Sequence, residues 1–536
     1  MRFQVLSHAG LLVEACGRSL VCDPWLVGST YWRSWWNYPP VDRELVRSLR
    51  PDYVYLTHVH WDHFTGPSLR LFDRATPIVI PREPAGRMRR DLGRMSFPNV
   101  VELKHGESLE IAAGFRITSY HFNLFTDSAL VIEADGKTLF NANDAKLMGG
   151  PLRQLLKRHP RIDFVLRSHS SANSRILYEV IDAPETPVDD RDRYVDDFAH
   201  FTRATGARWA IPFASNHCHL HPEVYRFNEY VVTPMEVKRH FEADGIASPA
   251  LQIMVSGDSW SSEHGFEIAD RDWFEKREEH LRAYQQQNRS RIEATDRLEE
   301  LTGLRWQRIA KYFDVVSAAM PWPLRHMFRG TPVLYVLTAG ANQSLVEVDF
   351  WSRQARLIDA YSDATHPVQI HTQTAIFRHC IGNDLFSHLA ISKRVRYRAT
   401  RDKIRLLKLL GLFYNFYEYE MLPLRRIEPA RFVGAWARRW RELLLYSRIA
   451  LDFGLGRGFS FQRHLPAPPP RRWDCAAGQS IRGQDSRCRP GVRWCSTLSS
   501  SATSAPIVTR GESCRRSPGT CRSRPPSGPL APRPSR

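Results

Sequence analysis

The segment Thr57–His63 reads Thr-His-Val-His-Trp-Asp-His and directly follows the apolar run Tyr53–Leu56. Side chains at i and i+2 of an extended segment point the same way, so His58 and His60 can reach one metal ion together. Asp62 and His63 lie where the chain turns toward a helix, and they can serve a second metal beside the first. Two neighbouring metals generate hydroxide from water and hold both oxygens of a displacement. The segment therefore predicts a binuclear metal site at the end of a strand.

Packing offers a poorer explanation of the same residues. A lone histidine on an apolar face is usually a hydrogen-bonded core residue. Four potential ligands within the six positions from His58 to His63 are not required by any core. Imidazole and carboxylate ligands suit zinc, and manganese and iron are alternatives.

Short apolar runs separated by turns predict a mixed α/β fold. Helices are predicted within 67–72, 152–159 and 189–204, and the aromatic-rich stretch Trp25–Pro40 is predicted to be a long loop. Helices interleaved with strands favour helices packed outside two sheets. Strands are predicted at 3–6, 11–14, 19–22, 53–56, 77–80, 100–103, 109–111, 115–120, 129–133, 138–141, 164–166 and 209–212.

The chain of 536 residues is too long for one ordinary core, so several domains are expected. The motif region covers residues 1–265, a polar helical linker covers 266–312, and a smaller α+β domain covers 313–460. The hydrophobic fraction of 43% is that of a soluble globular protein. Neither a signal-peptide core nor an apolar run of about 18 residues is present, so a cytoplasmic location is expected.

The net charge of +18 is concentrated in the Pro-, Ser- and Arg-rich stretch 466–536, which carries +10 and leaves +8 for the rest. This tail lacks periodic apolar residues and is predicted to be disordered. Its arginine bias and abrupt start suggest out-of-frame translation. Five of the nine cysteines fall in the tail, and no CxxC pair occurs, so neither disulfides nor a thiolate zinc site is predicted. A nucleic-acid partner is not expected.

The pattern H-x-H-x-D-H resembles the signature of the metallo-β-lactamase-fold metallohydrolases. This resemblance implies an αββα sandwich with two divalent metal ions. It also implies a third histidine ligand for the first metal, His121, and a carboxylate that bridges both metals, Asp144. The last ligand would be a histidine after a later strand, His217, with His219 and His221 as open alternatives.

Three further residues are expected near the metals. The resemblance implies that Asp23 supports the metal-binding histidines and that His8 lies near the site without being a ligand. His169 ends a predicted strand and either approaches the metals or substrate or lies in a surface loop.

Some stretches place the chain within a branch of this superfamily. Residues Asp23–Gly28, Trp35–Pro40 and Ile211–Ala214 are similar to the metallohydrolase-like part of CMP-N-acetylneuraminate hydroxylases. A broader likeness is to L-ascorbate-6-phosphate lactonases and N-acyl-phosphatidylethanolamine phospholipases D. The paired Cys and His ligands of a Rieske centre are not found, so hydroxylase activity is not expected.

These features predict a hydrolase in which Asp62 both ligates a metal and orients the attacking hydroxide. The substrate is expected to be a small anionic phosphoester or a carbonyl compound such as a lactone or amide, with an acyl or sugar group beside the aromatic loop. An iron-containing redox protein on the same fold is one alternative. Another is contact with a membrane surface through the basic helix predicted over 401–419, unless its apolar face packs on its own domain. The oligomeric state is left open.

Overall fold

The protein is described here from a computed structural model. The structure describes residues 1–469 apart from 126, 171, 173, 184–190, 456 and 458. The predicted disordered tail, 466–536, lies outside these residues except for its first four positions. Residues Met1–Ala477 form one compact unit.

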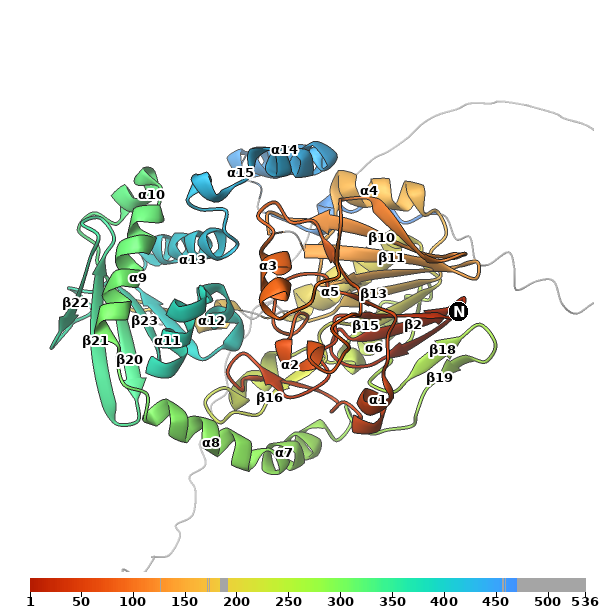
Figure 1. The fold of residues 1–536 in the computed structure, drawn as a ribbon, viewed down its shortest axis with the longest axis horizontal. Helices are drawn as coiled ribbons and strands as arrows, with labels where there is room; N and C mark the ends of the chain where they lie inside the picture. Colours follow the sequence, from red (N-terminus) through yellow and green to blue (C-terminus); the bar gives the residue numbers. More distant parts are fainter. Residues whose placement is uncertain are drawn as a thin grey trace, which may run out of the picture. The chain divides into compact units, whose positions relative to one another are not determined.

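Two sheets stack in the first half of the chain (Figure 1). In the first sheet, β1 pairs with β2 and β2 with β3 in antiparallel fashion, whereas β3, β6, β7 and β8 are parallel. The strand that precedes the histidine motif, β6, is therefore central. In sheet order the strands are β19 (Gly265–Glu267), β18 (Ser259–Ser261), β1 (Arg2–Val5), β2 (Leu11–Ala15), β3 (Arg18–Cys22), β6 (Tyr53–Tyr55), β7 (Ile78–Pro81) and β8 (Val100–Leu103).

The second sheet has antiparallel strands at one side and parallel strands at the other. The ends of β10 and β12 carry His121 and, one residue beyond β12, Asp144. In sheet order the strands are β17 (Ala250–Leu251), β15 (Trp209–Phe213), β13 (Phe164–Ser168), β12 (Lys137–Asn143), β11 (Asp127–Ala134), β10 (Phe115–Phe122) and β9 (Glu107–Ala112).

Each of the two sheets buries apolar side chains on both of its faces. Leu20 and Tyr55 of the first sheet pack against Ile117 and Leu130 of the second in a buried core between the sheets. Successive side chains of a strand point to opposite faces of its sheet, and the apolar residues on the outer faces pack on helices. The helices are α1 (Arg43–Ser48), α2 (Gly66–Leu69) and α3 (Arg87–Arg94) on one side and α4 (Gly149–Arg158), α5 (Arg191–Thr205) and α6 (Pro234–Ala243) on the other. The predicted αββα sandwich is confirmed.

The stretch Trp25–Pro40 is only partly the loop that was predicted. It contains β4 (Ser29–Thr30) and β5 (Trp35–Asn37), and β5 pairs with β16 (His217–His219). Its irregular composition hid these strands because each is too short to show alternation. The pairing holds two of the candidate histidines against the tryptophan-rich segment.

A smaller α+β domain follows α7 (Arg277–Gln287) and α8 (Arg289–Glu300), and this part of the prediction is also confirmed. Its edge strand β14 (Tyr178–Val180) comes from the first half of the chain and pairs in parallel with β24. In sheet order the strands are β14, β24 (Val395–Ala399), β23 (Val368–Gln373), β20 (Val333–Ala339), β21 (Asn342–Asp349) and β22 (Gln354–Ile358). The helices are α9 (Trp306–Ala319), α10 (Trp322–Met327), α11 (Thr374–Asn383), α12 (Phe386–Ser392) and α13 (Ile404–Glu418).

The basic helix considered for membrane contact is α13. Its apolar side chains, among them Leu406, Leu410 and Phe413, are buried in the core of this second domain. The apolar face of this helix therefore packs on its own domain, and contact of its basic face with a membrane stays a prediction. None of the described helices combines the length and apolar character needed to cross a bilayer.

The last two helices return to the first sandwich. In Figure 1, α14 (Pro429–Arg438) and α15 (Trp440–Gly454) lie near α4. Leu445 of α15 joins the core under α4, where a Cβ on Gly149 would lie only 2.8 Å from a Leu445 methyl carbon. The predicted domain limits stay a prediction, but α15 packs with the first sandwich and not with the second sheet.

A buried carboxyl at the end of α13 gives the fold a pH dependence. Burial raises the pKa of Glu418 to about 8 from 4.5, although both its oxygens accept the Ser387 N–H at 2.9 Å. The folded state then binds a proton at Glu418 more tightly than the unfolded state does. The contribution of this carboxyl to stability is therefore greatest below about pH 4.5 and is lost as the pH rises to about 8.

We expect Glu418→Gln to remove this slope. Thermal unfolding between pH 5 and pH 9 should show the variant gaining on the wild type as pH rises. The matched control Glu229→Gln, at an exposed site, should follow the wild type. Parallel curves for wild type and Glu418→Gln would show that this carboxyl is ionised in the folded protein throughout.

Candidate metal centre

The histidine motif leaves the central strand β6 and turns back immediately. His58 Nε2 lies 2.8 Å from His60 Nδ1, so the two rings present nitrogens to one point, as their i, i+2 spacing predicted. The backbone N–H groups of His63 and Phe64 both donate to the His60 carbonyl and close the turn. This local geometry separates the first two histidines from Asp62 and His63.

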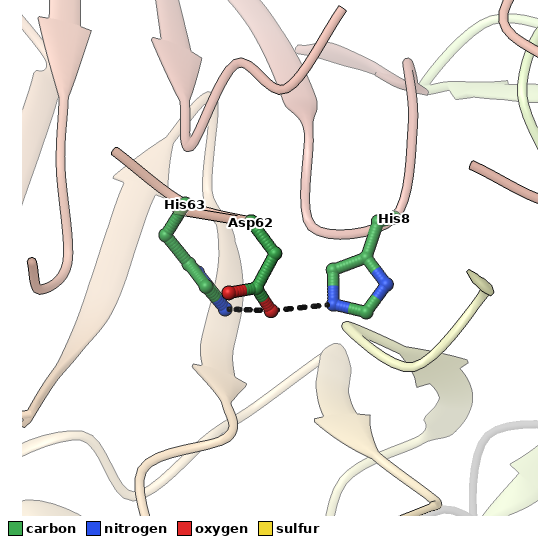
Figure 2. Close-up of side chains that lie close together, drawn as sticks. All are labelled: His8, Asp62 and His63. Atoms are coloured by element: carbon green, nitrogen blue, oxygen red, sulfur yellow. Dashed lines mark ion pairs between the residues drawn. The ribbon is translucent and has the colours of Figure 1, made fainter. Parts of the chain in front are cut away.

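Ligand atoms gather in two groups. One consists of His58, His60 and Asp144, and the other of His8, Asp62 and His63, with the ligand atoms of each group within 4.8 Å of one another. Figure 2 shows the second group, in which Asp62 Oδ2 lies 3.1 Å from His8 Nε2 and 3.5 Å from His63 Nε2.

Asp144 belongs to the first group and also reaches the second. Its Oδ2 is 3.6 Å from His58 Nε2 and 3.6 Å from His63 Nε2. One carboxylate thus faces a histidine of each group, which is the placement required of a ligand shared by two cations. Asp144 therefore lies beside the motif, as the resemblance implied, whereas His121 and His217 belong to neither group.

Unpartnered polar atoms test whether cations fit. Buried nitrogens and oxygens are nearly always hydrogen-bonded. Here the Nε2 atoms of His63, His121 and His217 and Oδ1 of Asp144 are buried, and they find no hydrogen-bond partner among the described residues. Neutral imidazole and carboxylate are the donors that divalent zinc, manganese and iron accept, so the residues fit such ions.

Electrostatics favour the metal-binding forms of several groups. Burial, reinforced by His58, lowers the pKa of His60 to about 4, and burial lowers the pKa of His121 well below its usual range. Both imidazoles are therefore neutral and keep a lone pair. Burial alone would raise the pKa of Asp62, but His63 and His8 outweigh it and hold that carboxyl ionised.

His63 is the exception in the metal-free protein. Burial opposes its protonation, but three neighbouring carboxylates, with Asp144 the strongest, raise its pKa to about 10. A protonated ring here balances the excess negative charge of the site. Metal binding displaces protons from histidine ligands, so a cation would replace this charge.

Asp23 supports the motif from beneath. Its Oδ1 accepts the Thr57 N–H at 2.8 Å, and its Oδ2 accepts the Thr57 hydroxyl at 2.7 Å. The same Oδ2 lies 2.9 Å from His63 Nδ1, which leaves His63 Nε2 directed at the candidate metals. Asp23 is fully buried and has a φ of 43°, a strained conformation that its three contacts stabilise.

His121 and His169 sit at strand ends that face this region. The residue opposite His121, Ser128 on β11, donates to the Thr57 carbonyl, which places the strand end beside the motif. His169 is fully buried with both ring nitrogens unpartnered among the described residues, and burial followed by His8 lowers its pKa to about 3. The surface-loop alternative for His169 is therefore wrong.

The three histidines of β16 and its flank have different surroundings. His217 stacks on Trp35 at 3.6 Å between ring centroids and lies 5.5 Å from His8. His219 shares this face of the strand, with a buried Nε2 that has no partner among the described residues. His221 Nε2 instead pairs with Asp296 at 2.7 Å, so His221 belongs to a separate pair.

Tyr31 was not predicted from the sequence. Its hydroxyl donates to Asp62 Oδ1, while His8 occupies Oδ2, so both oxygens of Asp62 have partners. Tyr31, Trp32 and Arg33 have φ values of 51°, 55° and 64°. A run of three left-handed residues costs about 1–2 kcal/mol each and marks a functional position.

The second domain stabilises this strained turn. Arg394 donates to the Trp32 carbonyl at 2.9 Å and forms a two-point ion pair with Glu299 at 2.7 and 2.8 Å. Trp32 Nε1 also donates to His379 Nδ1 at 2.9 Å. Nothing in the local sequence indicates these contacts, since they join residues more than 90 positions apart.

Two more side chains of the second domain reach the motif and were also missed. Tyr419 Oη lies 3.4 Å from His60 Nε2, and the ring of His388 lies 5.6 Å from that of His60. His388 is 2% exposed, and its Nε2 has no partner among the described residues. For His388 the sequence offered only a histidine within an amphipathic helix, and this does not indicate which site the helix faces.

A cavity of 610 Å³ opens beside the motif, and it is lined by aromatic and basic residues including Tyr31, Trp32, Trp61, Phe64 and His388. The other tryptophans of the 25–36 segment, Trp25, Trp35 and Trp36, are at most 3% exposed. Most tryptophans of this segment are therefore buried in the core, and Trp32 forms a wall of the cavity.

Comparisons with known proteins agree with this geometry. Residues 18–172 match the family described as a β-lactamase superfamily domain, a range that includes Asp23, the motif, His121 and Asp144. Over 248 residues the chain is 29% identical to a Mycolicibacterium smegmatis protein named as a Rieske 2Fe-2S iron-sulfur protein, covering 43% of this chain and 46% of that one.

One further relative matches a smaller part of the chain, and another similarity is to a solved structure. The chain is 26% identical over 153 residues to cytidine monophosphate-N-acetylneuraminic acid hydroxylase of Xenopus laevis, covering 27% of this chain and 26% of that one. The solved isothiocyanate hydrolase from Delia radicum gut bacteria is 18% identical with a TM-score of 0.35, covering 49% of this chain and 99% of that one. The chain thus spans less than half the length of these curated relatives.

Tyr419→Phe tests whether the second domain orients a metal ligand. If His60 binds through Nδ1, its Nε2–H donates to Tyr419, and losing this partner should weaken metal binding about 10-fold. Competition with a chromophoric chelator measures this affinity. Tyr361→Phe, half-buried away from the motif, is the control. Equal metal affinity in wild type and Tyr419→Phe would contradict the role.

Proposed function

We propose that this chain is a metal-dependent hydrolase that uses two divalent cations, because residues 18–172 match a β-lactamase superfamily domain. The observation that supports it most directly is the position of Asp144, 3.6 Å from a histidine of each ligand group. His58, His60 and His121 would hold one cation, and Asp62, His63 and His217 the other, with zinc as the expected metal and manganese or iron as alternatives.

When bound, such a pair of cations supplies hydroxide at neutral pH and stabilises negative charge on oxygen. The chain's own groups orient the reaction. Asp62 is held at both oxygens, by Tyr31 and by His8, so its carboxylate keeps one direction toward the reacting centre. Asp62 would accept a hydrogen bond from the attacking water and orient it, since its carboxyl is held ionised and its direction is fixed.

The buried surroundings exclude bulk water from the reacting centre. His8, His63, His121 and His217 are each at most 3% exposed. Low dielectric strengthens every charge interaction of the site. We infer that the substrate enters as a small molecule with an acyl, sugar or other flat group against the aromatic cavity, and that the bond cleaved is a phosphoester, lactone or amide.

A redox protein remains a second candidate, and the names of the relatives favour it. They include a Rieske iron-sulfur protein and a hydroxylase. The same nitrogen and oxygen donors accept iron. Iron that copurifies with the chain, together with oxygen consumption, would favour this candidate over a hydrolase.

His60→Ala and Asp62→Ala test the hydrolase proposal. Each removes a metal ligand, so we expect metal affinity to fall by more than the roughly 10- to 100-fold that loss of an outer-shell partner costs. The purified variants should then retain little metal and should not hydrolyse bis-p-nitrophenyl phosphate or p-nitrophenyl esters. Metal content is measured by plasma mass spectrometry.

The control for these variants is His264→Ala, which removes an exposed histidine far from the motif in sequence. It should keep wild-type metal content. Wild-type metal content in both His60→Ala and Asp62→Ala would refute the assignment of the site. If both variants lose their metal but the wild type hydrolyses none of the esters tested, the assignment of the site would stand and the redox candidate would be favoured.

A further inference from the structure

A cleft of 810 Å³ lies apart from the aromatic cavity. Its walls come from residues 176–180 and 223–227 of the first half and from the six-stranded sheet of the second domain. Val336 and Val395 form an apolar floor, and Thr338, Gln343 and Gln373 add polar groups. A volume of this size is typical of a small-molecule site.

Positive charge dominates the cleft. Two glutamates line it, but Glu179 pairs with Arg398 at 3.0 Å and Glu223 with Arg394 at 2.9 Å, and neither arginine belongs to the lining. The lining arginines are Arg226 and Arg396. Among the described residues neither forms a salt bridge, so their charge is not compensated within the structure.

The inner end of the cleft faces β16, the strand that carries His217 and His219. Lys393 lies there with its ammonium 5.9 Å from the ring of Phe227, and the Phe227 ring lies 6.5 Å from that of His219. Lys393 is 4% exposed and donates to the Ala172 carbonyl.

We propose that this cleft binds an anionic group of the substrate, a carboxylate or a phosphate, through Arg226 and Arg396, with Lys393 at the end nearest the metals. The proposal rests on the proposed function for the claim that the ligand is a substrate. Guanidinium groups form paired hydrogen bonds to both anions, and the apolar floor accommodates the carbon chain between the anion and the bond that is cleaved.

Two exposed arginines on a flat surface would need no ligand, because water solvates them. Here Arg226 and Arg396 come from distant parts of the chain and converge on one concave surface beside a buried lysine.

The test is anion binding by the full chain after removal of metals with a chelator, so that metal-bound anion does not contribute. Inorganic phosphate and glutarate are titrated separately, by equilibrium dialysis and thermal shift. We expect the wild type to bind one or both of these anions saturably. The anion that binds more tightly shows whether the cleft prefers a phosphate or a carboxylate. Arg226→Ala/Arg396→Ala should weaken this binding by about 10-fold or more.

Arg308→Ala, an exposed arginine on α9 outside the cleft, is the matched control and should bind as the wild type does. Absence of saturable binding of both anions, or equal binding by the double variant, would overturn the proposal. Because metal-free protein is used, a failed cleft and a failed hydrolase are distinguishable: the first is decided by anion binding and the second by the metal-ligand variants.

Discussion

One buried carboxylate, that of Asp23, holds the loop that carries the histidine motif. Three donors converge on it: the Thr57 N–H, the Thr57 hydroxyl and His63 Nδ1. A buried carboxylate without such partners would be very costly, so the loop after β6 has one favourable conformation. That conformation directs the free nitrogens of the motif away from Asp23 and toward Asp62 and Asp144.

The other side of the centre is held by the second domain. Arg394 and Glu299 stabilise the left-handed turn at 31–33, and this turn places Tyr31 on Asp62. His388 of α12 and Tyr419 at the end of α13 approach His60. The two parts of the chain therefore build one site, which explains why a strained turn and a buried ion pair persist despite their cost.

Much of the fold followed from sequence pattern. Helices interleaved with short apolar strands predicted two sheets covered by helices, and the spacing of His58 and His60 predicted that they would reach one point. The β4–β5–β16 sheet could not be predicted, because its strands have two or three residues and pair over about 180 positions. Without that pairing, nothing distinguished His217 from His219 and His221.

The sequence by itself determined the ligand types, the local geometry of 57–63 and the layered α/β architecture, because these depend on residue chemistry and on periods of two and 3.6 residues. Only the tertiary structure decided the rest. It paired His221 with Asp296, buried His169, placed Asp144 between two histidines and brought Tyr31, His388 and Tyr419 to the motif. Contacts between distant segments depend on how whole elements pack, and no local pattern records that.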